Sequence, residues 1–165
     1  MNVETKLREG EVAVDMPVAS DAGLVFIGRI RTPWKSREET PRQGSYDGPI
    51  CQIEIFEPWV PALKGVDFYA HLEVIYWLHH SPRNLVLQSP KKNGQTRGTF
   101  SLRSPVRPNP IGTSIVKLVG IEGSTVLVRG LDCLDGTPLV DLKPDRTLFA
   151  PLAPPQTGDF QVGDK

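Results

Sequence analysis

The chain has 165 residues, and its 19 basic and 19 acidic side chains give a formal net charge of zero. This length suits one domain with a sizeable core, and no apolar run is long enough to predict a transmembrane helix. Residues 1–17 carry acidic side chains and lack an apolar signal core, which favours a cytoplasmic protein. Cys51 and Cys133 lack metal-ligand or disulfide-framework spacing, so we expect two reduced thiols, with a bridge as the less favoured alternative.

The charges are unevenly distributed along the chain. No acidic residue lies between Glu73 and Glu122, whereas the same window contains Arg83, Lys91, Lys92, Arg97, Arg103, Arg107 and Lys117. Aspartates are frequent in the C-terminal part instead. A local basic patch on a neutral chain attracts a polyanion or a phosphorylated ligand. The zero net charge therefore leaves nucleic acid open as a partner.

The N-terminal part of the sequence predicts an arm, a strand and a long loop. Residues 1–22 have weak periodicity and mixed charge, and residues 24–30 are rich in strand-forming side chains. Residues 31–48 combine prolines and many charges without an apolar period, and long ordered loops in compact domains tend to be functional. Within this loop, Gln43, Gly44 and Ser45 follow a proline turn, and the glycine allows backbone groups to approach a ligand. A solvated loop without a ligand is the competing interpretation.

The most apolar run, residues 68–78, is the best candidate for a central strand. Before it, residues 50–56 alternate as a half-buried strand does, and residues 58–64 suit a short helical turn. His71 and His79 are eight residues apart, so in an unbroken strand they share a face. No third ligand has metal-like spacing, so we expect no metal site. The pair His79-His80 is better interpreted as the rim of a pocket.

Residues 97–116 contain three arginines, three prolines and two glycines. Pro108-Asn109-Pro110 fixes the backbone and excludes a helix or a central strand, so we predict one rigid loop between two strands. This loop would hold Arg103, Arg107 and Asn109 in fixed directions, although a surface connection without function is the alternative. The preceding residues 81–98 are polar and interrupted by proline and glycine, and a mobile basic turn is expected at Lys91-Lys92.

The C-terminal part predicts a hairpin and one more short strand. Residues 114–119 and 125–128 flank a turn at 122–124, and residues 139–142 form a further strand. Short strands, long Pro/Gly loops and little helix together indicate an all-β protein, a compact barrel or sandwich. No glycine-rich fingerprint follows a strand, so a Rossmann-type site is not expected. We predict an N-terminal arm (1–22), a barrel domain (23–150) and a tail (151–165) that lies on the surface or swaps onto a partner.

Several motifs follow one another in an order that is informative. They are Ile27-Gly28-Arg29-Ile30, Pro41-Arg42-Gln43-Gly44, His71-Leu72 with His79, Arg103-Ser104-Pro105, Arg107-Pro108-Asn109-Pro110-Ile111-Gly112, and Asp135-Gly136-Thr137-Pro138. Over residues 24–148 this arrangement resembles the TrmO (TsaA-like) family, and the Arg-Pro-Asn-Pro-Ile-Gly block is highly specific.

The resemblance implies a compact β-barrel that binds S-adenosyl-L-methionine without a Rossmann fold and acts as a homodimer. It implies N6-methylation of the threonylcarbamoyladenosine next to the tRNA anticodon. Carried over position by position, the implied cofactor-binding residues are Gln43, Gly44, Ser45, His79, His80, Arg103, Thr113, Arg129, Gly130, Leu131 and Asp132.

The chemistry of the residues suggests how the roles divide. Arg103 suits the cofactor carboxylate, and Asp132 suits its ammonium or a ribose hydroxyl. The urea-like acceptor nitrogen needs a nearby base or hydrogen-bond acceptor, for which Asp132, Asp135 and a pocket histidine are candidates. Asn109 is a candidate for orienting the acceptor. We expect four basic residues to face the phosphates of the anticodon stem-loop: Lys91, Lys92, Arg97 and Arg107.

One departure from the family leaves other functions open. Longer members carry a further C-terminal domain, which we do not expect here because the sequence continues for only about 20 residues after residues 143–144. A methyltransferase of the same fold with a smaller substrate is therefore one alternative. A non-catalytic β-barrel that binds RNA or a nucleotide through the basic window is another.

Overall fold

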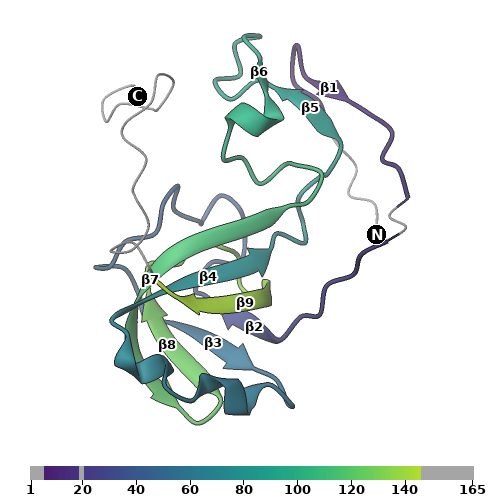
Figure 1. The fold of residues 1–165 in the computed structure, drawn as a ribbon. Coiled ribbons are helices and arrows are strands. Elements are labelled where there is room, and N and C mark those ends of the chain that lie inside the picture. The colour runs from purple at the N-terminus through teal and green to yellow at the C-terminus, as the bar shows by residue number, and fades with distance from the viewer. Residues whose placement is uncertain (1–5, 19–20, 146–165) are drawn as a thin grey trace.

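The computed structural model describes residues 6–18 and 21–145. In this part of the chain, six antiparallel strands close into a barrel, and three further strands form a small separate sheet (Figure 1). The barrel order is β2 (Gly28–Arg31), β3 (Cys51–Ile55), β8 (Thr125–Arg129), β7 (Ile111–Glu122), β4 (His71–Trp77) and β9 (Pro138–Pro144). The small sheet has the order β1 (Val12–Ala13), β5 (Leu85–Gln88) and β6 (Arg97–Gly98). The predicted all-β barrel is confirmed.

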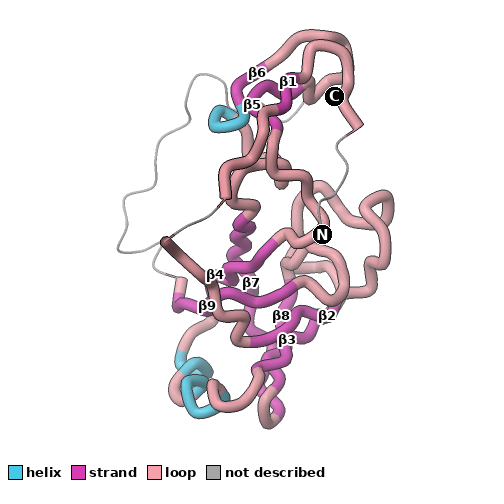
Figure 2. Tube along the Cα trace, turned by 90° about the vertical axis from the view of Figure 1, so that its right-hand side faces the viewer, coloured by secondary structure: helices cyan, strands magenta, loops and turns pink. Residues whose placement is uncertain are grey.

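Short 3-10 turns complete the described elements. η1 (Val60–Leu63) and η2 (Val66–Phe68) lie between β3 and β4, at the end of the molecule opposite the small sheet, and η3 (Thr99–Ser101) follows β6 (Figures 1 and 2). None of the helices in the described residues is long and apolar enough to cross a membrane.

Strand alternation builds the barrel core. Every second residue of β3, β4 and β8 points inward, and the fully buried side chains include Ile53, Val74, Val126 and Val128. Burying each such side chain contributes on the order of 1.5–3 kcal/mol relative to exposure. Cys51 and Cys133 are buried free thiols, and burial raises the pKa of Cys51 to about 11, so this thiol stays protonated at neutral pH.

Most predicted strands are found, with shifted ends. The predicted hairpin is β7–β8, in which Glu122 pairs with Thr125 and Gly123 has a φ of 60°. The predicted strand over residues 24–30 begins only at Gly28. Leu24 is 49%, Val25 63% and Phe26 41% exposed, so these residues lie outside the barrel wall, whereas Ile27 packs against the core. The apolar pattern of the sequence did not predict that strand pairing with β3 and β9 begins at Gly28.

The predicted loop over residues 97–116 is wrong in extent. β6 and η3 occupy its first residues, and β7 begins at Ile111, directly after Pro110. The non-repetitive segment is therefore residues 102–110, which we call the signature loop. The last proline ends the loop and leaves all later N–H groups available to the sheet, so β7 starts there.

Residues 81–98 are not merely a polar connection, because they contain β5 and β6. The expected arm supplies β1, in which Val12 pairs with Leu87. Gln88 is buried, and its Nε2 donates to the Val106 carbonyl at 2.8 Å and to Thr99 Oγ1 at 2.9 Å. The small sheet thus holds the signature loop in place through Gln88 of β5. The predicted tail (151–165) lies outside the described residues, and the division into arm, barrel and tail stays a prediction.

Candidate functional site

The loop between β2 and β3 packs closely against the end of β8. A methyl group on Gly44 would overlap the carbonyl of Gly130, so the two backbones touch. Gly130 has a φ of 112°, and its Cα faces the ring of Tyr46. The guanidinium of Arg129 donates to the Gly48 carbonyl. Two separately predicted segments, 43–45 and 129–132, are therefore brought together.

Asp132 lies in a hydroxyl-lined corner beside this contact. Its Oδ1 accepts hydrogen bonds from the Tyr76 hydroxyl at 3.1 Å and from Ser114 Oγ at 3.4 Å, and the two hydroxyls are 2.9 Å apart. Burial and the adjacent Asp132 charge raise the pKa of Tyr76, so the phenol stays protonated and donates. β4, β7 and the segment after β8 together fix the direction of this carboxylate.

Tyr76 and Ser114 were missed from the sequence. Tyr76 belongs to the alternating run of β4, where it counts as a core residue, and it is 4% exposed. Gly112 lies opposite it across the ladder, where any side chain would overlap the phenol ring. The glycine of the Arg-Pro-Asn-Pro-Ile-Gly block was the available signal, because it makes room for the tyrosine.

Arg103 and Thr113 are brought together by the signature loop. Arg103 Nη2 donates to Thr113 Oγ1 at 3.3 Å, and both residues are exposed. Arg107 turns back onto its own loop, where Nη1 donates to the Leu102 carbonyl at 3.2 Å and to the Ser104 carbonyl at 3.3 Å. Arg97 Nη2 likewise donates to the Ser101 carbonyl at 3.4 Å. The Arg103 side chain is thus exposed, whereas the guanidinium groups of Arg97 and Arg107 donate to backbone carbonyls within five residues of them.

Asn109 and the two histidines gather near the end of β4. Arg83 holds the turn, because its Nε donates to the Pro108 carbonyl at 2.6 Å and its Nη2 to Asn109 Oδ1 at 3.3 Å. The same guanidinium lies 5.3 Å from the centre of the Trp77 ring. β4 ends before His79, so His71 and His79 do not share a strand face. The rings of His79 and His80 are 3.8 Å apart, and burial together with the His80 charge lowers the pKa of His79.

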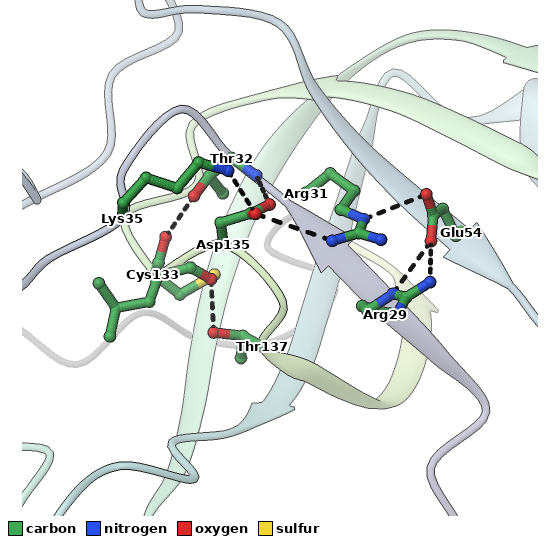
Figure 3. A network of polar contacts seen from close by, with 9 residues as sticks. Arg29, Arg31, Thr32, Lys35, Glu54, Cys133, Asp135 and Thr137 are labelled. Carbon is green, nitrogen blue, oxygen red and sulfur yellow. Dashed lines mark hydrogen bonds and ion pairs between the residues drawn. The ribbon is translucent and has the colours of Figure 1, made fainter.

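Asp135 belongs to a separate ion-pair network (Figure 3). Its carboxylate accepts from Lys35 Nζ at 2.5 Å and from the Thr32 N–H at 3.2 Å, and it lies 3.7 Å from Arg31 Nη1. Arg31 continues the network to Glu54, which also pairs with Arg29. These bonds tie the turn before β9 to the end of β2. The carboxylate is thus engaged by cations, unlike that of Asp132.

An open cleft of about 1620 Å³ extends between the small sheet and the loop that follows β2. Its lining includes one acidic residue, Glu11, and seven basic ones: Lys6, Arg8, Arg37, Arg42, Lys91, Lys92 and Arg103. We call it the basic cleft. Gln43 and Arg103 line it beside Lys91 and Lys92, so predicted cofactor and RNA residues share one opening. Such a concentration of positive charge attracts anions.

The sequence model described as the tRNA-methyltransferase O N-terminal domain matches residues 29–148. The chain belongs to this family. A probable S-adenosyl-L-methionine-binding protein, VirR of Rhizobium radiobacter, is 64% identical over 150 residues, which cover 91% of this chain and 86% of that protein. The tRNA (adenine(37)-N6)-methyltransferase of Homo sapiens is 33% identical over 126 residues, which cover 72% of this chain and 29% of that protein.

Solved structures of the family share the fold. The crystal structure of TrmO from Pseudomonas aeruginosa superposes with a TM-score of 0.69 at 30% identity, covering 84% of this chain and 62% of that one. The chain therefore spans about three-fifths of that TrmO structure. The family resemblance expected from the motifs is confirmed, whereas the individual site residues stay predictions.

Replacement of Gly44 tests the contact that organises the site. In Gly44→Ala the added methyl group overlaps the Gly130 carbonyl, so the loop must move away from β8. We expect the free energy of unfolding to fall by about 1–3 kcal/mol, and affinity for S-adenosylmethionine to weaken. Gly23→Ala is the matched control, because no atom lies within 4 Å of its added methyl. Wild-type calorimetric affinity in Gly44→Ala would refute this role.

The pH dependence of stability tests the Asp135 network. The bond from Lys35 holds the pKa of Asp135 below its ordinary range, helped by the Thr32 N–H and the Arg31 charge against the opposing effect of burial. The stabilisation is complete above the ordinary carboxyl pKa of about 3.9 and is lost as the pH falls through the lowered value.

Asp135→Asn should accordingly be less stable than the wild type at pH 7. The difference should shrink as the pH falls below about 4. Asp67→Asn, in the exposed turn η2, serves as the control and should parallel the wild type. Urea unfolding at a series of pH values measures both, and parallel curves for Asp135→Asn and the wild type would contradict the assignment.

Proposed function

We propose that the protein is an S-adenosylmethionine-dependent methyltransferase that modifies N6 of the threonylcarbamoyladenosine next to the tRNA anticodon. The observation that carries this proposal is the packing of Gly44 on Gly130, which unites two predicted cofactor segments next to the basic cleft. Family membership and the names of the relatives support the same activity.

The residues present fit the chemical groups of this cofactor. Arg103 presents an exposed guanidinium that suits a carboxylate, and Asp132 presents a fixed carboxylate that suits a neutral ribose hydroxyl. Because Gly44 and Gly130 carry no side chain, the loop and the end of β8 pack closely, and we propose that main-chain groups beside this contact, including those of Leu131, recognise an adenine edge. We propose Gln43, Ser45, His79, His80, Thr113 and Arg129 as the surrounding wall.

The bound cofactor supplies a methyl group attached to a positively charged sulfur. The protein must then orient the acceptor nitrogen and take its proton. We propose Asp132 for the proton, because Tyr76 and Ser114 aim its carboxylate without neutralising its charge. The sequence also suggested Asp135, but Lys35 and Arg31 engage that carboxylate, so we assign it to positioning the turn before β9. Asn109, held by Arg83, is proposed to orient the acceptor.

The basic cleft is proposed to receive the anticodon stem-loop. Lys91 and Lys92 line it near Arg103, where phosphates would approach the cofactor corner. Arg97 and Arg107 remain proposed contacts, although each already donates to a carbonyl of its own segment.

We further propose a cytoplasmic homodimer. The outer face of β7 exposes a stripe in which apolar side chains alternate with Thr113 and Lys117; Ile111 is 42%, Ile115 39% and Val119 45% exposed. A second copy of the chain covering this stripe would remove apolar area from water.

Methyl transfer to purified tRNA with and without the threonylcarbamoyl group tests the proposed activity. We expect transfer only to the modified tRNA, and a loss of about 10²–10⁴-fold in kcat for Asp132→Asn. Asp67→Asn is again the matched control and should retain wild-type kcat.

Two other outcomes of these experiments would each favour one of the alternative functions. Cofactor binding without transfer to either tRNA would favour a smaller substrate. Absence of cofactor binding would favour a non-catalytic RNA- or nucleotide-binding barrel.

A further inference from the structure

The N-terminal segment Lys6–Ala13 is docked onto the small sheet rather than free of the domain. Besides the β1–β5 pairing, Glu11 Oε1 accepts from the Ser89 N–H at 3.0 Å, and Arg8 Nη1 donates to the Ser89 carbonyl at 3.3 Å. Just after β1, the Val14 N–H donates to the Asn84 carbonyl at 2.8 Å. Contacts on both sides of β1 therefore set the position of the segment.

This docking brings two more cations to the basic cleft. Lys6 and Arg8 line it together with Arg37 and Arg42 of the loop after β2. The one acidic side chain in the lining is Glu11, and both of its oxygens already accept backbone N–H groups, from Ser89 and from Arg8. The cations of the cleft are thus in excess over its carboxylate, and they come from four separate segments of the chain.

The size of the cleft favours a polymer over a single small ligand. At about 1620 Å³ it exceeds the roughly 300–1,000 Å³ typical of small-molecule pockets. Seven basic residues line it, as suits several phosphates. The family's sequence model begins at residue 29, so the segment lies outside the matched region and the family match gives it no role.

We propose that the segment Lys6–Ala13 forms one wall of the RNA-binding cleft, and that Lys6 and Arg8 contact phosphates of the tRNA. The proposal rests on the proposed function and adds to it two cations, Lys6 and Arg8, besides Arg37 and Arg42 in the same lining. An RNA strand held in the cleft would also reach Arg103 and Gln43, which line the same opening. Glu11 anchors the segment through its bond to Ser89, and Arg8 adds a bond to the same residue while it lines the cleft with Lys6.

Charge-neutral variants of the full-length chain test this role. Lys6→Gln, Arg8→Gln and the double variant are titrated with labelled tRNA over a range of salt concentrations. Each substitution should weaken binding several-fold and reduce the slope of log K against log salt by about 1. The matched control is Lys64→Gln, since Lys64 is exposed and follows η1, at the end of the molecule opposite the small sheet.

Further readouts separate RNA contact from a structural role. Affinity for S-adenosylmethionine and kcat at saturating tRNA should equal those of the wild type, whereas KM for tRNA should rise. The charge-conserving variant Lys6→Arg/Arg8→Lys should keep the wild-type salt slope. Lys6 lies outside the anchoring contacts, so its variant remains informative if Arg8→Gln loosens the segment.

The outcomes are distinguishable. The inference is overturned if the wild type methylates tRNA while the glutamine variants keep the wild-type KM and salt slope. It is also overturned if they lose cofactor affinity or kcat in parallel with RNA binding. A wild type that binds no tRNA would overturn the proposed function together with this inference.

Discussion

The contact between the backbones of Gly44 and Gly130 is the constraint on which the candidate site depends. β8 is fixed by pairing with β3 and β7, so its last residues give the long loop after β2 a rigid surface on which to pack. Two residues further on, Asp132 is aimed by hydroxyls from β4 and β7. A closed barrel with one close backbone contact thus places a loop and a carboxylate together without a helix or a nucleotide-binding fingerprint. This explains how a small all-β domain can build the site we propose.

The small sheet extends this arrangement toward the solvent. Buried Gln88 connects β5 to the signature loop, and Glu11 connects the N-terminal segment to the same sheet. The N-terminal segment and the signature loop with Arg103 are therefore held by the same small sheet. The two aspartates Asp132 and Asp135 differ in the groups that contact their carboxylates. Asp132 accepts hydrogen bonds from two neutral hydroxyl groups, whereas Asp135 forms ion pairs with Lys35 and Arg31 (Figure 3).

Much of the barrel was predictable from the sequence, because alternation over residues 50–56 and the hairpin around Gly123 report on local structure. The small sheet was not, because β1 and β6 are two residues long each and depend on partners distant in sequence. The motifs suggested Gly44 and Asp132 as site residues, but pattern gives no direction for a side chain. The engagement of Asp135 by Lys35, 100 residues earlier, therefore became visible only in three dimensions.

The central claim is that the loop after β2 and the segment after β8 form one cofactor site. Backbone amide NMR of the protein titrated with S-adenosylmethionine tests it most directly. The largest chemical-shift changes should fall on Gly44, Gly130 and Leu131 together and follow a single binding curve. Changes confined to the outer face of β7, for example at Val119, with these three amides unmoved, would contradict the account.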